Sequence, residues 1–466
     1  MKILLAGYNV DADVLAELTQ GTNRQDVTPE TLSASYARIS RDPRSIDELR
    51  KIARSEVEKA RKSNSNIIFK MGHHSVAEHA VFNFDLIDVS RLAMEEIEKF
   101  RLCSYTEKSQ RYQKLEGGVL VAGEVVGGRD EEKYKKIIEK QNAFYQEMVG
   151  EGIEPEDARY ITSLATYGQV GLTINARNLE LLIRRFAASK LAEVREIGQK
   201  LYALAAKIAP SIILFTAPSD LDQKTYGEMA KMVKTDRKNK ISAPCVLVDY
   251  TPQADIKLVS SLIHTVSGIS YLKARRTAKQ MKVKEREALV KKAGEYLEFY
   301  DPTLREFEHI SLTYDLVMSS GCFAQMKRHR MSTITSQAYN PALGVTIPPK
   351  IRATKHERRF NEIIAETDAV YNELAKTDQH AAEYVLTGAH RKRSLMTVNA
   401  RELYHISRLR EDKHAQWDIQ NVSAALAKAA KAVMPLTMQL IGGKDKYQEI
   451  YQGVFGRPPK ILPPQE

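Results

Sequence analysis

The hydrophobic pattern marks two short segments in which apolar and polar residues alternate. They read "EHAVFNFDL" at residues 78–86 and "EHISLTYDL" at residues 308–316. Alternation with a period of two is typical of a half-buried strand, so each segment is predicted to be a β-strand. Further along, Leu403, Ile406 and Leu409 recur at three-residue steps. This spacing predicts an amphipathic helix with one apolar face.

The same order of segments occurs twice along the chain. "LTINARNLELLIRRF" from Leu172 matches "MTVNARELYHISRLR" from Met396, and "SQRYQKLEGGVLV" from Ser109 matches "SQAYNPALGVTIP" from Ser336. With the alternating strands, these are three matches in one order, which predicts a tandem duplication. Each half is expected to hold a strand and helix, the alternating strand, a helix, a loop and a long helix. The polar segment 234–242 is the predicted seam.

Length and composition predict an ordinary packed protein. The chain has 466 residues, of which 43% are hydrophobic, enough for two or three domains. No apolar run approaches the roughly 20 residues that cross a bilayer, so a cytoplasmic protein without a membrane partner is expected. The three cysteines, Cys103, Cys245 and Cys322, are too scattered for a disulfide framework or a zinc site, and no metal is expected.

The charge balance favours anionic ligands. Seventy Lys and Arg against fifty-nine Asp and Glu give a net charge of +11, and the excess is spread along the chain. This pattern favours nucleotides or phosphorylated cofactors over nucleic acid. Arg328, His329 and Arg330 stand side by side. Because neighbouring like charges repel, the triplet indicates either a solvated basic edge or a site for an anion.

Four motifs carry a family resemblance. "GHHSVAEHAVFNF", "KFRLCSYTEKSQRY", "RHR" and "TVNARELYHISRLREDKHAQWDIQ" resemble the flavin-dependent thymidylate synthases, whose signature is Arg-His-Arg, seven residues, then Ser-x-Arg-Tyr. The resemblance covers both halves. It implies an α+β fold in two tandem copies, 1–235 and 240–466, each a twisted sheet with long helices. It also implies FAD, NADPH, methylenetetrahydrofolate and dUMP. The family's homotetramer would become a homodimer of fused chains.

Neither half keeps the whole pattern. In the first half, Lys99 and Phe100 replace the first two residues of the triplet, and Glu96 replaces the family's nucleotide-binding Gln. In the second half, Ser336 follows the triplet two residues too early, Ala338 replaces the motif Arg and Glu383 replaces the partner Arg. The positions that match are in the first half His73, Ser75, Glu107, Ser109, Arg111, Tyr112 and Arg159, and in the second Gln325, Arg328, His329, Arg330, Asn399, Arg401, Arg410 and His414.

The resemblance assigns roles to these matched positions. The expected catalytic residues are Glu107, Ser109 and Arg410. The expected substrate-binding residues are Arg111, Arg159, Gln325, Arg328 and Arg410. The expected cofactor-binding residues are His73, Ser75, Arg328, His329, Arg330, Asn399 and His414. A 5′-phosphate requires several charge-assisted hydrogen bonds, best from Arg, which agrees with this set.

Because the residues lost in one half are largely those kept in the other, one composite site between the halves is predicted. It would carry out the FAD- and NADPH-dependent reductive methylation of dUMP to dTMP. Two alternatives stay open: a related flavin or nucleotide enzyme with another acceptor, and a non-catalytic binding homologue. For some single residues, a purely structural role is an alternative to a functional one. Asn175 and Asn399 are equally consistent with helix caps, and Ser109 with a turn.

Overall fold

The structure is a computed structural model of the chain. It describes all residues except 24–25, 112–114, 116–117, 234–242, 299–300 and 461–466, so the predicted seam and Tyr112 lie outside the described residues. The chain forms two compact units, Met1–Arg237 with Pro348–Thr387 and Lys238–Ile347 with Gly388–Glu466. These units differ from the linear halves of the duplication, and the boundaries 1–235 and 240–466 stay a prediction.

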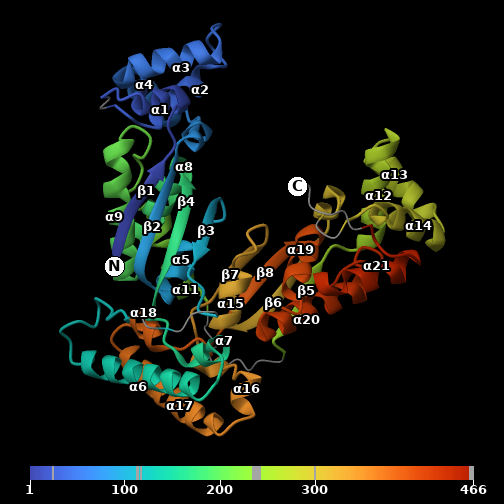
Figure 1. Cartoon of the computed structure of the whole chain (residues 1–466). Coiled ribbons are helices and arrows are strands. Elements are labelled where there is room, and N and C mark those ends of the chain that lie inside the picture. Colours follow the sequence, from blue (N-terminus) through green and yellow to red (C-terminus); the bar gives the residue numbers. More distant parts are fainter. Residues whose placement is uncertain (24–25, 112–114, 116–117, 234–242, 299–300, 461–466) are drawn as a thin grey trace. The chain divides into compact units, whose positions relative to one another are not determined.

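Each half of the chain builds one four-stranded antiparallel sheet, and the two sheets share one topology (Figure 1). Their strand orders are β1-β2-β4-β3 and β5-β6-β8-β7. The strands are β1 (Lys2–Tyr8), β2 (Val81–Ser90), β3 (Cys103–Glu107), β4 (Tyr167–Asn175), β5 (Cys245–Tyr250), β6 (Ser311–Ser319), β7 (Thr333–Ser336) and β8 (Arg391–Asn399). The expected α+β fold in two tandem copies is therefore confirmed.

The alternating segments form strands β2 and β6, as predicted. In β2, Phe82, Phe84 and Leu86 are buried, whereas Asn83 and Asp85 are exposed. Successive side chains of a strand point to opposite faces, so the sequence pattern gives the sheet one packed face and one open face. Strand β4, which pairs with β2, and strand β3, which pairs with β4, were not predicted from the sequence.

Helices make up most of the remaining chain. In the first half they are α1 (Ala12–Thr19), α2 (Glu30–Arg38), α3 (Ile46–Ser55), α4 (Val57–Ser65), α5 (Arg91–Ile97), α6 (Glu131–Gly150), α7 (Pro155–Ala158), α8 (Ala176–Ala187), α9 (Ala192–Ile208), α10 (Asp220–Gln223) and α11 (Thr225–Met232). In the second half they are α12 (Ala254–Ser267), α13 (Tyr271–Gln280), α14 (Val283–Gly294), α15 (Ser320–Met326), α16 (Pro349–Arg352), α17 (His356–Leu374), α18 (Gln379–Ala382), α19 (Ala400–Arg410), α20 (Trp417–Val433) and α21 (Tyr447–Phe455).

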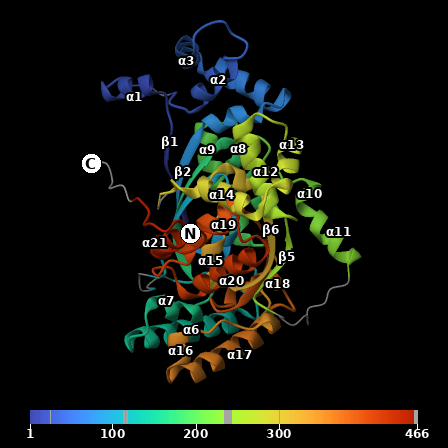
Figure 2. The same cartoon turned by 90° about the vertical axis from the view of Figure 1, so that its right-hand side faces the viewer.

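Two long helices cover the packed face of each sheet. In the first unit α8 and α9 lie against the sheet (Figures 1 and 2), and Leu182, Ile197 and Leu201 of these helices are buried. In the second unit α19 and α20 take the same place, and Leu403 and Leu426 belong to its core. Both α8 and α19 begin at the predicted Asn-Ala-Arg motif. The amphipathic pattern of the sequence therefore correctly identified the helix that closes each core.

A segment of the second half completes the first unit. Helix α17 packs against α6, and the Gln141 side chain donates hydrogen bonds to Thr367 Oγ1 and to the Val385 carbonyl, both at 2.9 Å. Ser163 and Thr387, which occupy equivalent positions before Asn175 and Asn399, form an isolated antiparallel bridge with each other. Pairing of equivalent residues indicates a local pseudo-twofold axis within this unit.

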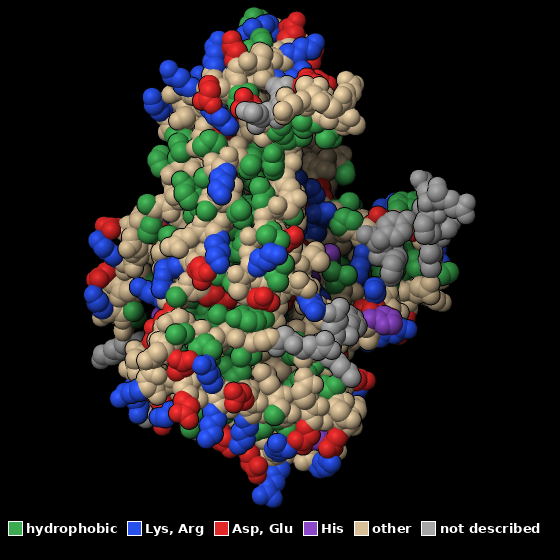
Figure 3. All heavy atoms as spheres, turned by 60° about the vertical axis from the view of Figure 1, so that its left-hand side comes forward, with side chains coloured by type: hydrophobic (Ala, Val, Ile, Leu, Met, Phe, Trp, Pro, Cys, Tyr) green, Lys and Arg blue, Asp and Glu red, His purple; other side chains and the backbone are tan. Residues whose placement is uncertain are grey.

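The surface carries charges of both signs. On the face shown in Figure 3, Lys and Arg side chains are interspersed with Asp and Glu. This agrees with the even spread of basic residues in the sequence. Among the described residues, no helix combines the length and the apolar character that crossing a bilayer requires.

Candidate functional site

The basic triplet of the second half begins at Arg328, two residues after the last residue of α15, Met326. Ser319 caps this helix by accepting a hydrogen bond from the Cys322 N–H at 3.0 Å, and the chain turns after Met326. Arg328 and Arg330 are exposed, whereas His329 is only 4% exposed. The three side chains therefore do not form one block of positive charge. Two guanidinium groups face outward and the imidazole faces inward.

The His329 imidazole lies between Arg410 and Glu402. Arg410 Nε donates to His329 Nε2 at 2.9 Å, and His329 Nδ1 lies 3.4 Å from Glu402 Oε1. Because Nε2 accepts a hydrogen bond, the proton of a neutral imidazole sits on Nδ1 and faces Glu402. Burial lowers the pKa of His329, nearby Arg410 lowers it further, and the hydrogen bond with Glu402 opposes both. The ring is therefore neutral at pH 7.

Gln325 joins this cluster. Arg410 Nη2 donates to the Gln325 carbonyl at 3.3 Å, and Gln325 Nε2 donates to Gln416 Oε1 at 3.3 Å. Gln325 Oε1 is buried and accepts no hydrogen bond from the described residues. An unpaired buried acceptor is costly and points to a missing donor. The structure thus brings three predicted residues, Gln325, His329 and Arg410, into one cluster.

Sequence reasoning missed Glu402 and Gln416 in this cluster. Glu402 follows the cap Asn399 in the first turn of α19, and Gln416 caps α20 by accepting from the Asp418 N–H at 3.2 Å. Both residues lie inside the motif "TVNARELYHISRLREDKHAQWDIQ" and at a helix start, and these were the signals that could have found them.

In the first unit, two of the predicted arginines meet at Glu156. Arg111 Nε forms an ion pair with the Glu156 carboxylate, and Arg159 Nε donates to the Glu156 carbonyl at 3.2 Å. Arg159 is 8% exposed, and its buried Nη2 has no hydrogen-bond partner among the described residues. Burial lowers the pKa of Arg159, and the positive charge of Arg111 lowers it further. Arg111 is thus paired with a carboxylate, and Arg159 keeps one buried N–H donor without a partner among the described residues.

Glu107 lies at the end of β3 and pairs with an arginine that sequence reasoning missed. Its carboxylate forms a buried ion pair with Arg91, the first residue of α5. Removing either partner of such a pair leaves an uncompensated buried charge. Ser109 accepts a hydrogen bond from the Arg111 N–H at 3.2 Å, which is the turn role considered for it from the sequence.

The other predicted cofactor residues are not gathered into these clusters. His73 and Ser75 are exposed at the start of the 3-10 helix His74–His79 of the first unit. Asn399 caps α19 by accepting from the Glu402 N–H at 2.8 Å, and His414 is exposed beyond the end of that helix. Their roles stay predictions.

Strand register corrects one alignment made from the sequence. Thr106 pairs with Gly171 in the first sheet and Thr335 pairs with Leu395 in the second, so Ser336 occupies the position of Glu107. The expected match of Ser336 with Ser109 is therefore wrong. The match of Ser336-Gln337 with Ser109-Gln110 in the sequence was misleading, because the second half has fewer residues after its edge strand than the first half has.

Comparisons with known proteins agree with the duplicated architecture. A family model described as "Thymidylate synthase complementing protein" matches residues 24–211 and again 246–436. A UPF0159 protein of Chlamydia pneumoniae is 22% identical over 428 residues, which cover 82% of this chain and 80% of that protein. A flavin-dependent thymidylate synthase of Geobacter sulfurreducens is 29% identical over 228 residues, covering 46% of this chain and 95% of that protein. Another from Pyrococcus furiosus is 29% identical over 170 residues, covering 35% and 68%.

Proposed function

This chain belongs to the flavin-dependent thymidylate synthase family, whose sequence it carries twice in tandem, and from this premise we propose that it methylates dUMP to dTMP. Methylenetetrahydrofolate would donate the carbon, and NADPH would reduce bound FAD. The proposed working form is a cytoplasmic homodimer of fused chains. Nearly the whole Geobacter enzyme corresponds to about half of this chain, which supports two family units per chain.

The observation that carries the proposal is the pair of guanidinium groups at Glu156. A nucleotide 5′-phosphate has nearly two negative charges and binds best to arginine N–H groups. The buried and unused Nη2 of Arg159 is such a donor, and Arg111 lies beside it. Arg111 and Arg159 are therefore proposed to hold the phosphate of dUMP.

The second cluster suits the electron-rich pyrimidine edge of a flavin. Exposed Arg328 and Arg330 offer cationic donors, and Arg410 holds His329 neutral with its Nδ1 proton toward Glu402. Bound FAD supplies the hydride chemistry that no side chain can provide. The chain's own contribution is to orient both ligands and to place positive charge where negative charge develops.

The proposed site residues are Glu107, Ser109, Arg111 and Arg159 from the first half and Gln325, Arg328, His329, Arg330 and Arg410 from the second. Glu107 and Ser109 would face the uracil ring, and the buried Arg91 holds the Glu107 carboxylate in place. Each set is kept in one half and largely replaced in the other, which supports different roles for the two halves.

The test is the reaction itself with its separate binding steps. The purified full chain should bind FAD by absorbance and dUMP by calorimetry, and it should form dTMP when NADPH and methylenetetrahydrofolate are added. The gene should also rescue a thymidine-requiring strain. Binding of FAD and dUMP without dTMP formation would favour a related enzyme with another acceptor. Failure to bind FAD would favour a non-catalytic homologue.

A further inference from the structure

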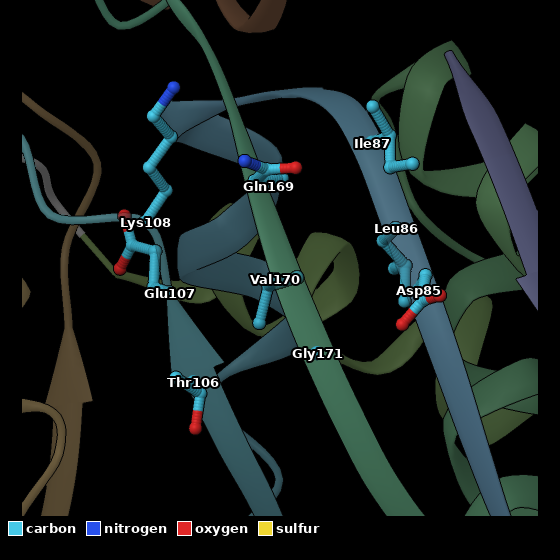
Figure 4. A pocket seen from close by; sticks show the side chains of 9 residues that line it. All are labelled: Asp85, Leu86, Ile87, Thr106, Glu107, Lys108, Gln169, Val170 and Gly171. Carbon is cyan, nitrogen blue, oxygen red and sulfur yellow. The ribbon is translucent and has the colours of Figure 1, made fainter. Parts of the chain in front are cut away.

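The hollow of about 400 Å³ on the first-half sheet belongs to the proposed site, because Glu107 lines it together with Lys108 and Gln169 (Figure 4). A different group of charged side chains, which contains no proposed site residue, lies on α13 and α14 of the second unit. Both helices pack beside α12 (Figure 1). Residues 270–292 hold nine Lys or Arg and two Glu, a net charge of +7. This stretch departs from the otherwise even spread of basic residues, on which the expectation against nucleic acid rested.

Helix α13 turns its cations toward solvent. Ala274 and Ala278, four residues apart, are fully buried. With 3.6 residues per turn, Arg276 lies opposite these alanines, with Lys273 on one side of it and Lys279 on the other. All three cations are exposed, and none forms an ion pair with a residue that the structure describes. The exposed side of this helix is therefore a face of uncompensated positive charge, called here the basic face of α13.

The corresponding helix of the first half is α3. Both helices begin at a serine cap, and each packs against a preceding helix that follows a Thr-Pro pair. The buried residues Leu49 and Ala53 of α3 stand at the same distances from the cap as Ala274 and Ala278 of α13. The two helices can therefore be compared position by position.

In the first half, carboxylates of the chain itself neutralise the cations of this helix. Arg54 Nη1 lies 2.9 Å from Asp11 Oδ1 and 2.6 Å from Asp13 Oδ2. Arg50 Nε lies 3.9 Å from Asp11 Oδ2. Asp11 caps α1, and Asp13 belongs to its first turn. The second half has no room for such a helix, because only residues 251–253 separate β5 from α12.

The equivalent cations of the second half lack this acidic cover. Arg275 and Lys279 occupy the positions of Arg50 and Arg54 and form no ion pair within the described part of the chain. Lys273 adds charge where the first half has a glutamate, and the corresponding segment 45–67 has a net charge of only +2. A face that binds anionic groups in the first half is thus open to an anionic partner in the second.

We propose that the basic face of α13 binds the phosphate backbone of duplex DNA. One exposed ion pair adds little to binding, so the partner must engage many of these cations at once. Duplex DNA carries one negative charge per roughly 1.7 Å of its axis and releases counterions when basic side chains contact it. An α-helix about 10–12 Å across fits the major groove, which is about 12 Å wide. Lys273 and Lys279, on either side of Arg276, would then face the two backbones that border the groove.

Other polyanions and surfaces fit this face less well. The major groove of duplex RNA is deep and narrow, which keeps side chains out. Single strands bind by stacking on aromatic rings, and Tyr271, the aromatic residue of α13, is half-buried. A helix that lies on a membrane needs a broad apolar face, whereas α13 exposes Leu272 as its large apolar residue. An acidic polypeptide spaces its charges at least about 3.3 Å apart when extended, which is less dense than DNA.

The test is fluorescence anisotropy of the full chain with a labelled DNA duplex of about 20 base pairs, two turns of the B-form helix. We expect a Kd of about 1–100 μM at physiological salt, and weaker binding as salt rises. The triple variant Lys273→Gln, Arg276→Gln and Lys279→Gln removes three phosphate contacts. It should weaken binding at least about tenfold and reduce the slope of log K against log salt by about 2.7.

A matched triple variant of the first half controls for net charge. Lys51→Gln, Lys59→Gln and Lys62→Gln remove three exposed cations from α3 and α4, the helices that correspond to α13 and α14. This variant should bind the duplex as the wild type does. Thermal melting checks that both variants are folded.

Loss of DNA binding in the α13 variant alone supports the proposal. If the wild type does not bind the duplex at low salt, or if both triple variants weaken binding equally, the basic face of α13 is not a DNA-binding surface. Tighter binding of duplex RNA or of a single strand of the same length would overturn the assignment to the DNA groove. Equal competition by poly-L-glutamate at the same charge concentration would assign the face to an acidic polypeptide instead.

Discussion

The two halves differ most clearly where the helix before the triplet meets the long helix. In the second half, His329 and Arg410 form a hydrogen-bonded polar pair. At the equivalent positions of the first half, Phe100 and Phe186 pack edge to face with their ring centroids 5.8 Å apart. Glu402, the other partner of His329, is replaced by Asn178, which hydrogen-bonds to its own helix cap Asn175 at 2.8 Å.

The two substitutions depend on each other. A phenylalanine in place of His329 alone would take from Arg410 Nε the acceptor that it has in this cluster, which costs more than an apolar pair of the same shape. The first half has changed both positions together, so its fold is intact although its polar cluster is gone. Replacement of both positions indicates that the first half lost the polar cluster and kept the packing at this place.

The opposite loss occurs at the anion site. Arg159 of the first half is buried beside Arg111, whereas the equivalent residue of the second half is Glu383. Because a carboxylate repels phosphate, we expect the second half to lack the proposed phosphate site of the first. Each half thus keeps one set of charged groups and has lost the other.

The largest expected effect is at Arg159. Arg159→Ala removes a buried cation from the proposed phosphate site and should weaken dUMP binding by about 2–4 kcal/mol, or roughly thirty- to a thousandfold. Calorimetry with dUMP measures it. The matched control Glu383→Ala, at the equivalent position of the second half, should leave dUMP affinity unchanged. Greater damage from the control would mean that the two halves were assigned the wrong way round.

The next largest effect is expected when His329 and Arg410 are replaced by the phenylalanines of the first half. His329→Phe and Arg410→Phe, made singly, should each destabilise the fold by about 1–3 kcal/mol, because each strands a polar partner. The double variant should recover about 1 kcal/mol or more relative to the sum of the singles, since it reproduces the aromatic pair of the first half. Urea unfolding measures the coupling. FAD absorbance should be absent from the double variant even though it is folded.

Phe100 provides the reverse control for that experiment. Phe100→Ala removes an aromatic contact and should destabilise the first half by about 1–3 kcal/mol, less than a fully buried phenylalanine would. It should not change FAD affinity, because the first half has no polar cluster at this place. Loss of FAD in Phe100→Ala with an intact fold would show that the first half also contacts the flavin here.

The number of FAD molecules bound per chain tests the difference between the two halves without any mutation. Only one half keeps the triplet, so we expect one FAD per chain, or two per homodimer. A spectroscopic titration gives this ratio, and light scattering gives the number of chains. A ratio of two FAD per chain would contradict the proposal that the first-half cluster has lapsed.

The sequence predicted the parts of the molecule that depend on local order. Alternation predicted β2 and β6, and the Asn-Ala-Arg motif predicted the capped helices α8 and α19, because strand faces and helix caps are set by neighbouring residues. The resemblance supplied Arg111 with Arg159 and His329 with Arg410. Arg111 lies near Arg159 in the first unit and His329 lies near Arg410 in the second, which agrees with the resemblance.

What the sequence did not predict depends on pairing over long distances. Arg91 reaches Glu107 only because α5 and β3 pack in three dimensions, and no short motif contains both residues. The equivalence of Ser336 and Glu107 comes from strand register, which sequence letters alone did not reveal. The placement of Pro348–Thr387 in the first unit follows from helix packing between residues more than 200 positions apart, such as Gln141 and Thr367.

The smallest expected effect concerns pH and the buried His329. Its pKa is lowered in the folded chain, chiefly by burial, so below about pH 6.5 the unfolded chain binds a proton that the folded chain resists. Stability should therefore fall as pH drops below that value, by at most about 1.4 kcal/mol per pH unit for one proton. His380 acts in the opposite sense, because its hydrogen bond with Glu383 raises its pKa. The difference between the wild type and His329→Gln, which keeps an acceptor for Arg410, isolates the first effect. Urea unfolding between pH 5.5 and 7.5 should show a shallower pH dependence in the variant. Equal slopes would mean that His329 takes up its proton over the same pH range in the folded and the unfolded chain, so that burial does not lower its pKa.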